Sequence, residues 1–183
     1  MDDILKHITD FGDTAHGEQL RKYSPDRYMV HPIRVMETLK SHTGDICVLA
    51  AALLHDVLED TPVTAEEIRK FLNKYLNEEE ADRTVDLVIE LTDVYVKKNY
   101  PRLNRRTRKE KELQRLARIS PDGQTIKYAD IMDNAQEISE EDTDFARVYL
   151  QEVRKIILEL NRGNVALRNE ALRVVNQAIA DQD

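Results

Sequence analysis

The sequence contains few residues that cross-link a chain or interrupt regular structure. Its 183 residues include one cysteine, five glycines, five prolines and no tryptophan. A single cysteine excludes a disulfide within the chain, and Cys47 lies in an apolar run, where we expect it to act as a small buried hydrophobic residue. The low glycine and proline content, together with 41% hydrophobic residues, favours a folded and helix-rich protein over a disordered one.

The sequence also lacks a long apolar segment and an excess of positive charge. No apolar run approaches the roughly 20 residues that a membrane-spanning helix needs. The first ten residues, MDDILKHITD, carry acids where a secretory signal carries bases. The net charge of −8 disfavours binding to nucleic acid or to anionic membranes. We therefore expect a cytoplasmic protein that binds no membrane and for which nucleic acid is a poor partner.

The spacing of apolar residues predicts helices along the whole chain. Apolar residues recur every three or four positions, which is the period of a helix with one buried face, and no segment alternates as a half-buried strand does. We expect about eight to nine helices, near residues 2–22, 29–42, 46–60, 64–76, 78–95, 101–120, 125–138, 142–162 and 164–181. The predicted fold class is therefore all-α.

A chain of this length most simply forms one domain, because it is long enough to bury a substantial core of its own. The sequence has no repeat, linker or low-complexity segment that would mark a boundary. We expect a single domain over residues 1–183. Its core should cover about 15–150, and the C-terminal helices at 142–181 should pack on that core.

The most informative segment is 46–60, ICVLAAALLHDVLED. An uncharged run, typical of a fully buried helix, leads directly into His55, Asp56, Glu59 and Asp60. Burying unpaired carboxylates is costly, and the helix dipole disfavours acids at the C-terminal end. A bound cation would account for this arrangement. The alternative is a helix that simply ends in a polar turn.

Two further residues are candidates for the same cation. His31 begins the preceding helix, and Asp130 interrupts an apolar helical face, where an unpaired acid is rare. For His31 alone, a capping or solvated role is the simpler alternative. With His55 and Asp56 these residues form a set of two histidines and two aspartates without a thiolate. Such a set favours an octahedral divalent ion such as Mn²⁺, Fe²⁺ or Co²⁺ over tetrahedral zinc.

A metal site beside spare carboxylates is typical of metal-assisted hydrolysis. The ion acidifies a water molecule and a carboxylate takes up its proton, and Glu59 and Asp60 are the candidates for that second role. The segment 97–118 carries ten basic residues and two acids, so it could attract a polyphosphate substrate. Its candidate phosphate ligands are Arg105, Arg106, Arg108 and Lys109. The alternatives are a solvated helix face or an RNA-binding surface, although few aromatic residues accompany the charges.

The order His31, His55-Asp56 and Asp130 resembles the HD superfamily of metal-dependent phosphohydrolases. Further blocks are similar to the hydrolase domain of RelA/SpoT proteins and to the small stand-alone alarmone hydrolases, which include the metazoan SpoT homologues. These blocks are AHGEQLRK (15–22), HPIRV (31–35), AALLHDVLEDT (51–61), RTRKE (106–110) and TIKYADIMDN (125–134). They occur in the same order and at similar spacings over most of the chain.

This resemblance implies a reaction and a set of roles. The family removes pyrophosphate from the 3′ position of (p)ppGpp, usually with Mn²⁺, and yields GDP or GTP. By the resemblance, the two histidines and two aspartates named above match the metal ligands, and Glu59 with Asp60 matches the pair that activates water. The residues that match nucleotide contacts are Arg21, which stacks on the base, Lys22, Asn134 and Tyr149.

The sequence departs from the family pattern at several positions. Ile131 replaces a basic residue, and Asp133 replaces an aromatic residue or histidine, which would put a negative charge near an anionic ligand. These departures leave open an HD phosphohydrolase of another nucleotide, such as a deoxynucleotide or NADPH phosphatase. A metal-containing nucleotide sensor without turnover is the non-enzymatic alternative, although a sensor has no need of Glu59 and Asp60. The oligomeric state is open.

Overall fold

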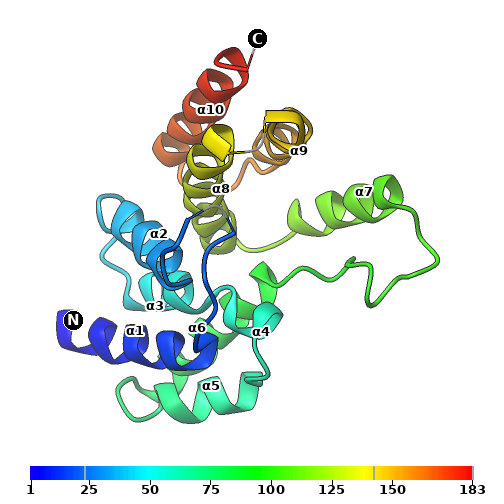
Figure 1. Cartoon of the computed structure of the whole chain (residues 1–183). Helices are drawn as coiled ribbons and strands as arrows, with labels where there is room; N and C mark the ends of the chain where they lie inside the picture. The colour runs from blue at the N-terminus through cyan, green and yellow to red at the C-terminus, as the bar shows by residue number, and fades with distance from the viewer. Residues whose placement is uncertain (23, 142, 183) are drawn as a thin grey trace.

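The computed structural model describes residues 1–22, 24–141 and 143–182, and within these residues it contains helices and no strand. The helices are α1 (Asp2–His16), α2 (Val30–Lys40), α3 (Ile46–Leu54), α4 (Val57–Asp60), α5 (Ala65–Leu72), α6 (Glu78–Leu91), α7 (Arg105–Leu116), α8 (Pro121–Glu141), α9 (Thr143–Glu159) and α10 (Val165–Ala180) (Figure 1). The all-α prediction is confirmed. No described helix has both the length and the apolar character needed to cross a membrane.

Helix α3 is the centre of the molecule. Every residue from Cys47 to Leu54 is buried, and α1, α2, α6 and α8 pack around the helix. Its first turn is capped by Asp45, whose side chain accepts a hydrogen bond from the Cys47 amide at 2.9 Å. A helix surrounded on all sides has no polar face, which explains the uncharged run in the sequence.

The expected helix over 46–60 is interrupted at its functional end. Helix α3 stops at Leu54, His55 and Asp56 form a turn, and the short α4 follows. The His55 ring contributes to the break, because its Nδ1 lies 2.7 Å from the Ala52 carbonyl, a group in the last turn of α3. The turn places two chemically active side chains where a regular helix would have continued.

Helix α1 ends earlier than the sequence pattern indicated. We expected a helix over 2–22, but α1 stops at His16 and Gly17 adopts φ 58°, a conformation that favours glycine. The segment after Gly17 folds back as a loop, held by an isolated antiparallel bridge between Leu20 and Arg27. This loop crosses in front of α8 in Figure 1, so it carries Arg21 toward α8.

Other helix ends also differ from expectation. Residues 121–123 were expected to be a break, but Pro121 occupies the first turn of α8, where a proline is tolerated. The Ser120 hydroxyl accepts a hydrogen bond from the Gly123 amide at 3.0 Å and so caps this end. The start of α5, expected near residue 64, carries a capping box: the side chains of Thr64 and Glu67 each accept a hydrogen bond from the other residue's backbone amide.

The C-terminal helices lie against α8, which is the longest helix of the described chain. The Tyr128 hydroxyl donates a hydrogen bond to the Leu160 carbonyl at 2.6 Å. At Gly163 the chain passes so close to α8 that an added Cβ would lie 2.7 Å from the Tyr128 ring. Helix α8 is thus fixed from both sides, with α2 and α3 on one and α9 and α10 on the other.

Candidate metal centre

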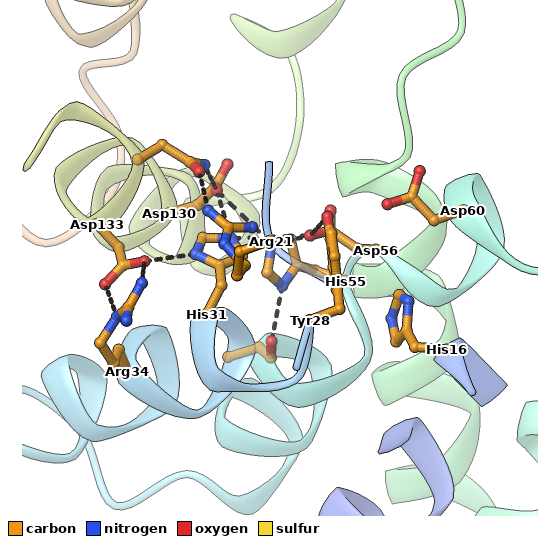
Figure 2. A network of polar contacts seen from close by, with 12 residues as sticks. His16, Arg21, Tyr28, His31, Arg34, His55, Asp56, Asp60, Asp130 and Asp133 are labelled. Carbon is orange, nitrogen blue, oxygen red and sulfur yellow. Dashed lines mark hydrogen bonds and ion pairs between the residues drawn. The ribbon is translucent and has the colours of Figure 1, made fainter. Parts of the chain in front are cut away.

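Four side chains expected to bind a cation meet where α2, α3 and α8 approach one another (Figure 2). Nε2 of His31 lies 3.7 Å from Asp56 Oδ2 and 3.2 Å from Asp130 Oδ1. Nε2 of His55 lies 3.2 Å and 3.6 Å from the same two oxygens. The ligand atoms of His31, His55 and Asp56 all lie within 4.8 Å of one another. One ion could therefore reach nitrogen and oxygen atoms from α2 and from the turn after α3, with Asp130 of α8 beside them.

The donor set fits a divalent cation. His31 and His55 are buried, and their Nε2 atoms both face the aspartates. Nδ1 of His55 bonds to the Ala52 carbonyl, whereas its buried Nε2 has no hydrogen-bond partner. An unpartnered buried polar atom is unusual, and a metal ion would satisfy it once the nitrogen has lost its proton. Imidazole nitrogens with carboxylate oxygens suit ions such as Mn²⁺ or Fe²⁺.

The charges of this cluster are strongly coupled. Burial acts to raise the pKa of Asp56 and of Asp130, but the neighbouring histidines, with Lys127 beside Asp130, outweigh it and lower both values. Burial acts to lower the pKa of His55, yet Asp56 and Asp130 raise it to about 9. The cluster therefore attracts positive charge, and metal binding will displace protons from the histidines.

A cavity of about 220 Å³ opens beside the cluster. Its walls include Asp56, Asp130 and Glu59, together with apolar residues of α6, α7 and α9. The Glu59 carboxylate accepts a hydrogen bond from the Asp93 amide at 3.1 Å. The cavity walls desolvate this carboxylate although the residue as a whole reaches solvent, and with the charge of Asp93 they raise the pKa of Glu59 to about 7. Such a group can act as a base near neutral pH.

Asp60 occupies a different position from Glu59. It lies at the end of α4, is exposed, and accepts a hydrogen bond from the Gln19 side chain at 3.2 Å. The walls of the cavity include Glu59 but not Asp60. Of the two carboxylates that sequence reasoning treated as a pair, Glu59 is therefore the one directed at the space beside the metal ligands.

Three of the expected nucleotide contacts also gather here. Arg21 donates a hydrogen bond to Asn134 Oδ1 at 2.9 Å, pairs with Glu137 and lies 5.3 Å from the centre of the Tyr28 ring. Asn134 and Tyr149 line the cavity. Burial raises the pKa of Tyr149, which keeps the hydroxyl protonated. Lys22 does not line the cavity; its ammonium lies 5.0 Å from the centre of the Phe145 ring, which stacks on Tyr149.

The basic residues of α7 separate into different environments. Arg105 is ion-paired with Glu152, and Arg108 donates to the Leu103 carbonyl. Of the four candidates on this helix, Lys109 alone lines the cavity beside the metal ligands. A surface groove of about 440 Å³ adjoins the cavity, and Arg105, Arg106 and Lys109 line it. The structure thus favours Lys109 as the basic residue nearest the cluster.

Several residues of the site were missed by sequence reasoning. The Lys127 ammonium lies 2.7 Å from Asp130 Oδ2, and the Tyr28 hydroxyl donates to Asp56 Oδ2 at 2.8 Å. Burial acts to lower the pKa of Lys127, but Asp130 and Asp93 raise it by a larger amount. The net pKa is raised, so the side chain stays charged. The three-residue spacing of Lys127 and Asp130 was a usable signal. Tyr28 and Asp93 lie in loops, where no periodicity indicates direction.

The expectation for Asp133 needs correction. The sequence suggested a negative charge near an anionic ligand. Instead, the carboxylate contacts His31 Nδ1 at 2.6 Å and the Arg34 guanidinium at 2.6 and 2.9 Å. It lines a hollow on the outer surface, away from the cavity beside the metal ligands. His16, from the AHGEQLRK block, is buried and stacks on Tyr28.

This chain is similar to known proteins in sequence and in fold. The MESH1 guanosine-3′,5′-bis(diphosphate) 3′-pyrophosphohydrolases of Mus musculus and Homo sapiens are each 33% identical to this chain over 139 residues, covering 74% of it and 69% of their own length. The solved structure of a metazoan ortholog of SpoT that hydrolyses ppGpp matches with a TM-score of 0.79 and 25% identity, over 95% of this chain and 94% of that one.

A second solved structure, lmo0812 from Listeria monocytogenes EGD-e, shares the fold with a TM-score of 0.58 at 23% identity, over 82% of this chain and 94% of that one. The model of the HD domain family matches residues 9–160, a span that contains all four candidate metal ligands. The protein therefore belongs to the HD domain family.

Proposed function

We propose that this protein is a metal-dependent hydrolase that releases pyrophosphate from the 3′ position of (p)ppGpp. One observation carries the proposal: two histidines and two aspartates converge beside a cavity whose wall also holds a carboxylate with a pKa of about 7. The relatives named as guanosine-3′,5′-bis(diphosphate) 3′-pyrophosphohydrolases support the choice of substrate.

The metal would be held by His31, His55, Asp56 and Asp130. When bound, a divalent ion lowers the pKa of a coordinated water and polarises a phosphoryl oxygen. The imidazole and carboxylate donors suit Mn²⁺, Fe²⁺ or Co²⁺. Mn²⁺ is our first choice because the hydrolase family that the sequence resembles usually uses it. The protein's own contribution is to fix these side chains. The Tyr28 hydroxyl holds Asp56, and the Lys127 ammonium holds Asp130.

Glu59 is the proposed general base. Its carboxylate lines the same cavity as Asp56 and Asp130, so it is placed to take a proton from an attacking water. The Asp93 amide fixes its orientation by a hydrogen bond. A pKa of about 7 leaves a large fraction of Glu59 deprotonated at neutral pH while keeping it a stronger base than an ordinary glutamate.

The nucleotide would be recognised around the same cavity. Lys109 would contact the phosphates, and Arg21, already oriented by Glu137 and Asn134, would contact the base. Ligand pockets usually measure about 300–1,000 Å³. The cavity is smaller than this range, but the adjoining groove shares Lys109 with it and supplies further space for the rest of the nucleotide.

The main rival is hydrolysis of another nucleotide. One reason to consider that alternative was Asp133, whose charge was expected to lie near the substrate. Since its carboxylate is engaged by His31 and Arg34 instead, it gives no reason to reject a polyphosphate. Ile131 does line the cavity, so an apolar side chain lies where the family has a basic residue, and this departure still supports the alternative.

The test is hydrolysis of ppGpp by the purified protein with Mn²⁺, Fe²⁺ or Co²⁺, and with EDTA, followed by anion-exchange separation of the products. We expect GDP and pyrophosphate, lost with EDTA and in the Asp56→Ala variant. A panel with NADPH and deoxynucleoside triphosphates runs in parallel. Faster turnover of a panel member than of ppGpp would contradict the substrate assignment. Absence of all turnover in metal-loaded protein would favour a nucleotide sensor.

A further inference from the structure

We propose that Asp133 and Arg34 form a pair that positions His31 for metal binding. This inference rests on the metal site of the proposed function, but it concerns residues that touch neither the cavity nor the ion's expected donor atoms. Asp133 belongs to α8 and Arg34 to α2, so the pair joins the two helices that supply His31 and Asp130.

The contacts around Asp133 are short and directional. Its Oδ2 lies 2.6 Å from His31 Nδ1. Arg34 approaches with two nitrogens, Nε at 2.6 Å from Oδ1 and Nη2 at 2.9 Å from Oδ2. The Asp133 side chain is 10% exposed and that of His31 is 1% exposed. A two-pronged arginine contact fixes the plane of the carboxylate, and the carboxylate in turn fixes the imidazole.

This arrangement determines which ring nitrogen of His31 is available to bind a metal ion. An ionised carboxylate accepts hydrogen bonds and cannot donate them, so Nδ1 must carry the proton that it shares with Asp133. When the ring is neutral, as metal binding requires, the lone pair then resides on Nε2, which faces Asp130 and Asp56 at 3.2 and 3.7 Å. A carboxylate behind a ligating histidine both orients the ring and increases its basicity as a ligand.

The other histidine is held in a different way. Nδ1 of His55 bonds to the Ala52 carbonyl within its own helical turn. His31 stands at the start of α2 and relies on a side chain from another helix (Figure 2). A change at Asp133 should therefore disturb one ligand and leave the other in place. We expect weaker metal binding in such a variant and not a collapse of the site.

The same pair connects to the nucleotide side of the site. Arg34 lies 3.7 Å from Glu137, which is ion-paired with Arg21. Arg21 donates to Asn134, and Asn134 donates to Asp130 Oδ1 at 2.7 Å. The contacts therefore run from His31 through α8 and back to Asp130. Because Arg21 retains Glu137 and Asn134 when Asp133 is changed, the effect on metal binding should exceed the effect on KM for ppGpp.

The experiment measures the dissociation constant of Mn²⁺, and of Co²⁺ by its absorption spectrum, in the absence of substrate. We expect Asp133→Ala to weaken binding by about 10- to 100-fold, the usual range for losing such a partner of a ligating histidine. Asp133→Asn, which keeps an oxygen for Nδ1 but loses the charge, and Arg34→Ala should cause smaller losses. Altered Co²⁺ absorption in Asp133→Ala would report the changed ligand directly.

The matched control is Arg27→Ala. Arg27 makes a similar two-pronged contact with Asp13, at 3.0 and 2.9 Å, outside the cluster. Its variant should bind metal as wild type does. The melting temperature of each metal-free variant separates a structural role from a positioning role. A lowered melting temperature with an unchanged dissociation constant would show that the pair only joins two helices, and it would overturn the inference.

The outcomes also distinguish this inference from the proposed function. If wild type and Asp133→Ala bind metal within twofold of each other while Asp56→Ala does not bind, the positioning role is refuted and the metal site stands. If wild type binds no divalent ion, both proposals fail together. Should Asp133→Ala not fold, Asp133→Asn and Arg34→Ala decide the question, and wild-type affinity in both would refute the inference.

Discussion

The two sides of the cavity differ in how firmly their side chains are held: most of the metal ligands are buried, whereas most charges of α7 are exposed. On the metal side, His31, His55 and Asp130 are almost fully buried, and packed helices or short hydrogen bonds hold each of them. On the opposite side, α7 projects away from the body formed by α1 to α6 (Figure 1). Of its residues, Glu112, Leu113 and Leu116 are buried, and most of its charges are exposed.

The difference follows from what each wall must do. Metal coordination requires donor atoms placed to within about half an ångström, which only side chains fixed by packing and further hydrogen bonds can achieve. Attraction of a polyanion acts over longer distances and tolerates mobile side chains. Helix α7 is held by Glu112, whose Oε2 accepts hydrogen bonds from the amides of Val94 and Tyr95 at 3.1 and 2.9 Å, and by ion pairs with α9. Substitutions on the two walls should therefore differ sharply in effect.

The largest effect is expected from removing a metal ligand. Asp56→Ala should lower kcat for ppGpp by at least about a thousandfold, because a catalytic metal contributes several kcal/mol to transition-state stabilisation. Bound metal, measured by elemental analysis, should fall in parallel. Asp86→Ala, which removes an exposed acid of α6, is the control and should leave both quantities unchanged. Full activity in Asp56→Ala would contradict the whole assignment of the site.

The next effect separates the two carboxylates of α4. Glu59→Gln should reduce kcat by about 10²- to 10⁴-fold, the range for a general base, while metal content is retained. Asp60→Asn should cost less, because Asp60 is exposed and contacts Gln19 instead of lining the cavity. Steady-state kinetics on metal-loaded protein test both variants. A larger loss in Asp60→Asn than in Glu59→Gln would reverse the proposed roles.

A third prediction concerns pH. Since Glu59 must be deprotonated to act as a base, kcat/KM should rise with pH through about 7, the value to which desolvation and Asp93 raise its pKa. Asp93→Asn removes a neighbouring negative charge, which makes the ionised form of Glu59 easier to reach. The acidic limb of the profile should therefore move to lower pH. If the acidic limb of the kcat/KM profile does not move in Asp93→Asn, a group other than Glu59 determines it.

The smallest effect is expected from the basic residues of α7. Lys109→Ala should raise KM for ppGpp by about tenfold, because a hydrogen bond to a charged group contributes about 1.5–3 kcal/mol and each 1.4 kcal/mol corresponds to tenfold. Lys111→Ala, which removes an exposed charge of the same helix outside both the cavity and the adjoining groove, should change KM by less than about twofold. Equal effects of the two variants would indicate a diffuse attraction and no specific contact at Lys109.

Much of the fold could be predicted because its causes are local. The uncharged run ending at Leu54 required a helix buried on all sides, and Thr64 with Glu67 marked the start of α5. The early end of α1 also had a local signal, Gly17, which the helical spacing on either side concealed. The break between α3 and α4 had none, since it depends on the His55 ring turning back to a carbonyl of its own helix.

What the sequence by itself determined is which groups are costly to bury. An acid in an apolar helix, such as Asp130, or a histidine and aspartate after an apolar run must find a partner wherever they lie, and this marks them as a site. Only the tertiary structure decided the partners. Asp133 turns toward His31, and Lys109 alone of its group reaches the cavity, because contacts between helices depend on how their faces pack, which residue spacing within one helix does not specify.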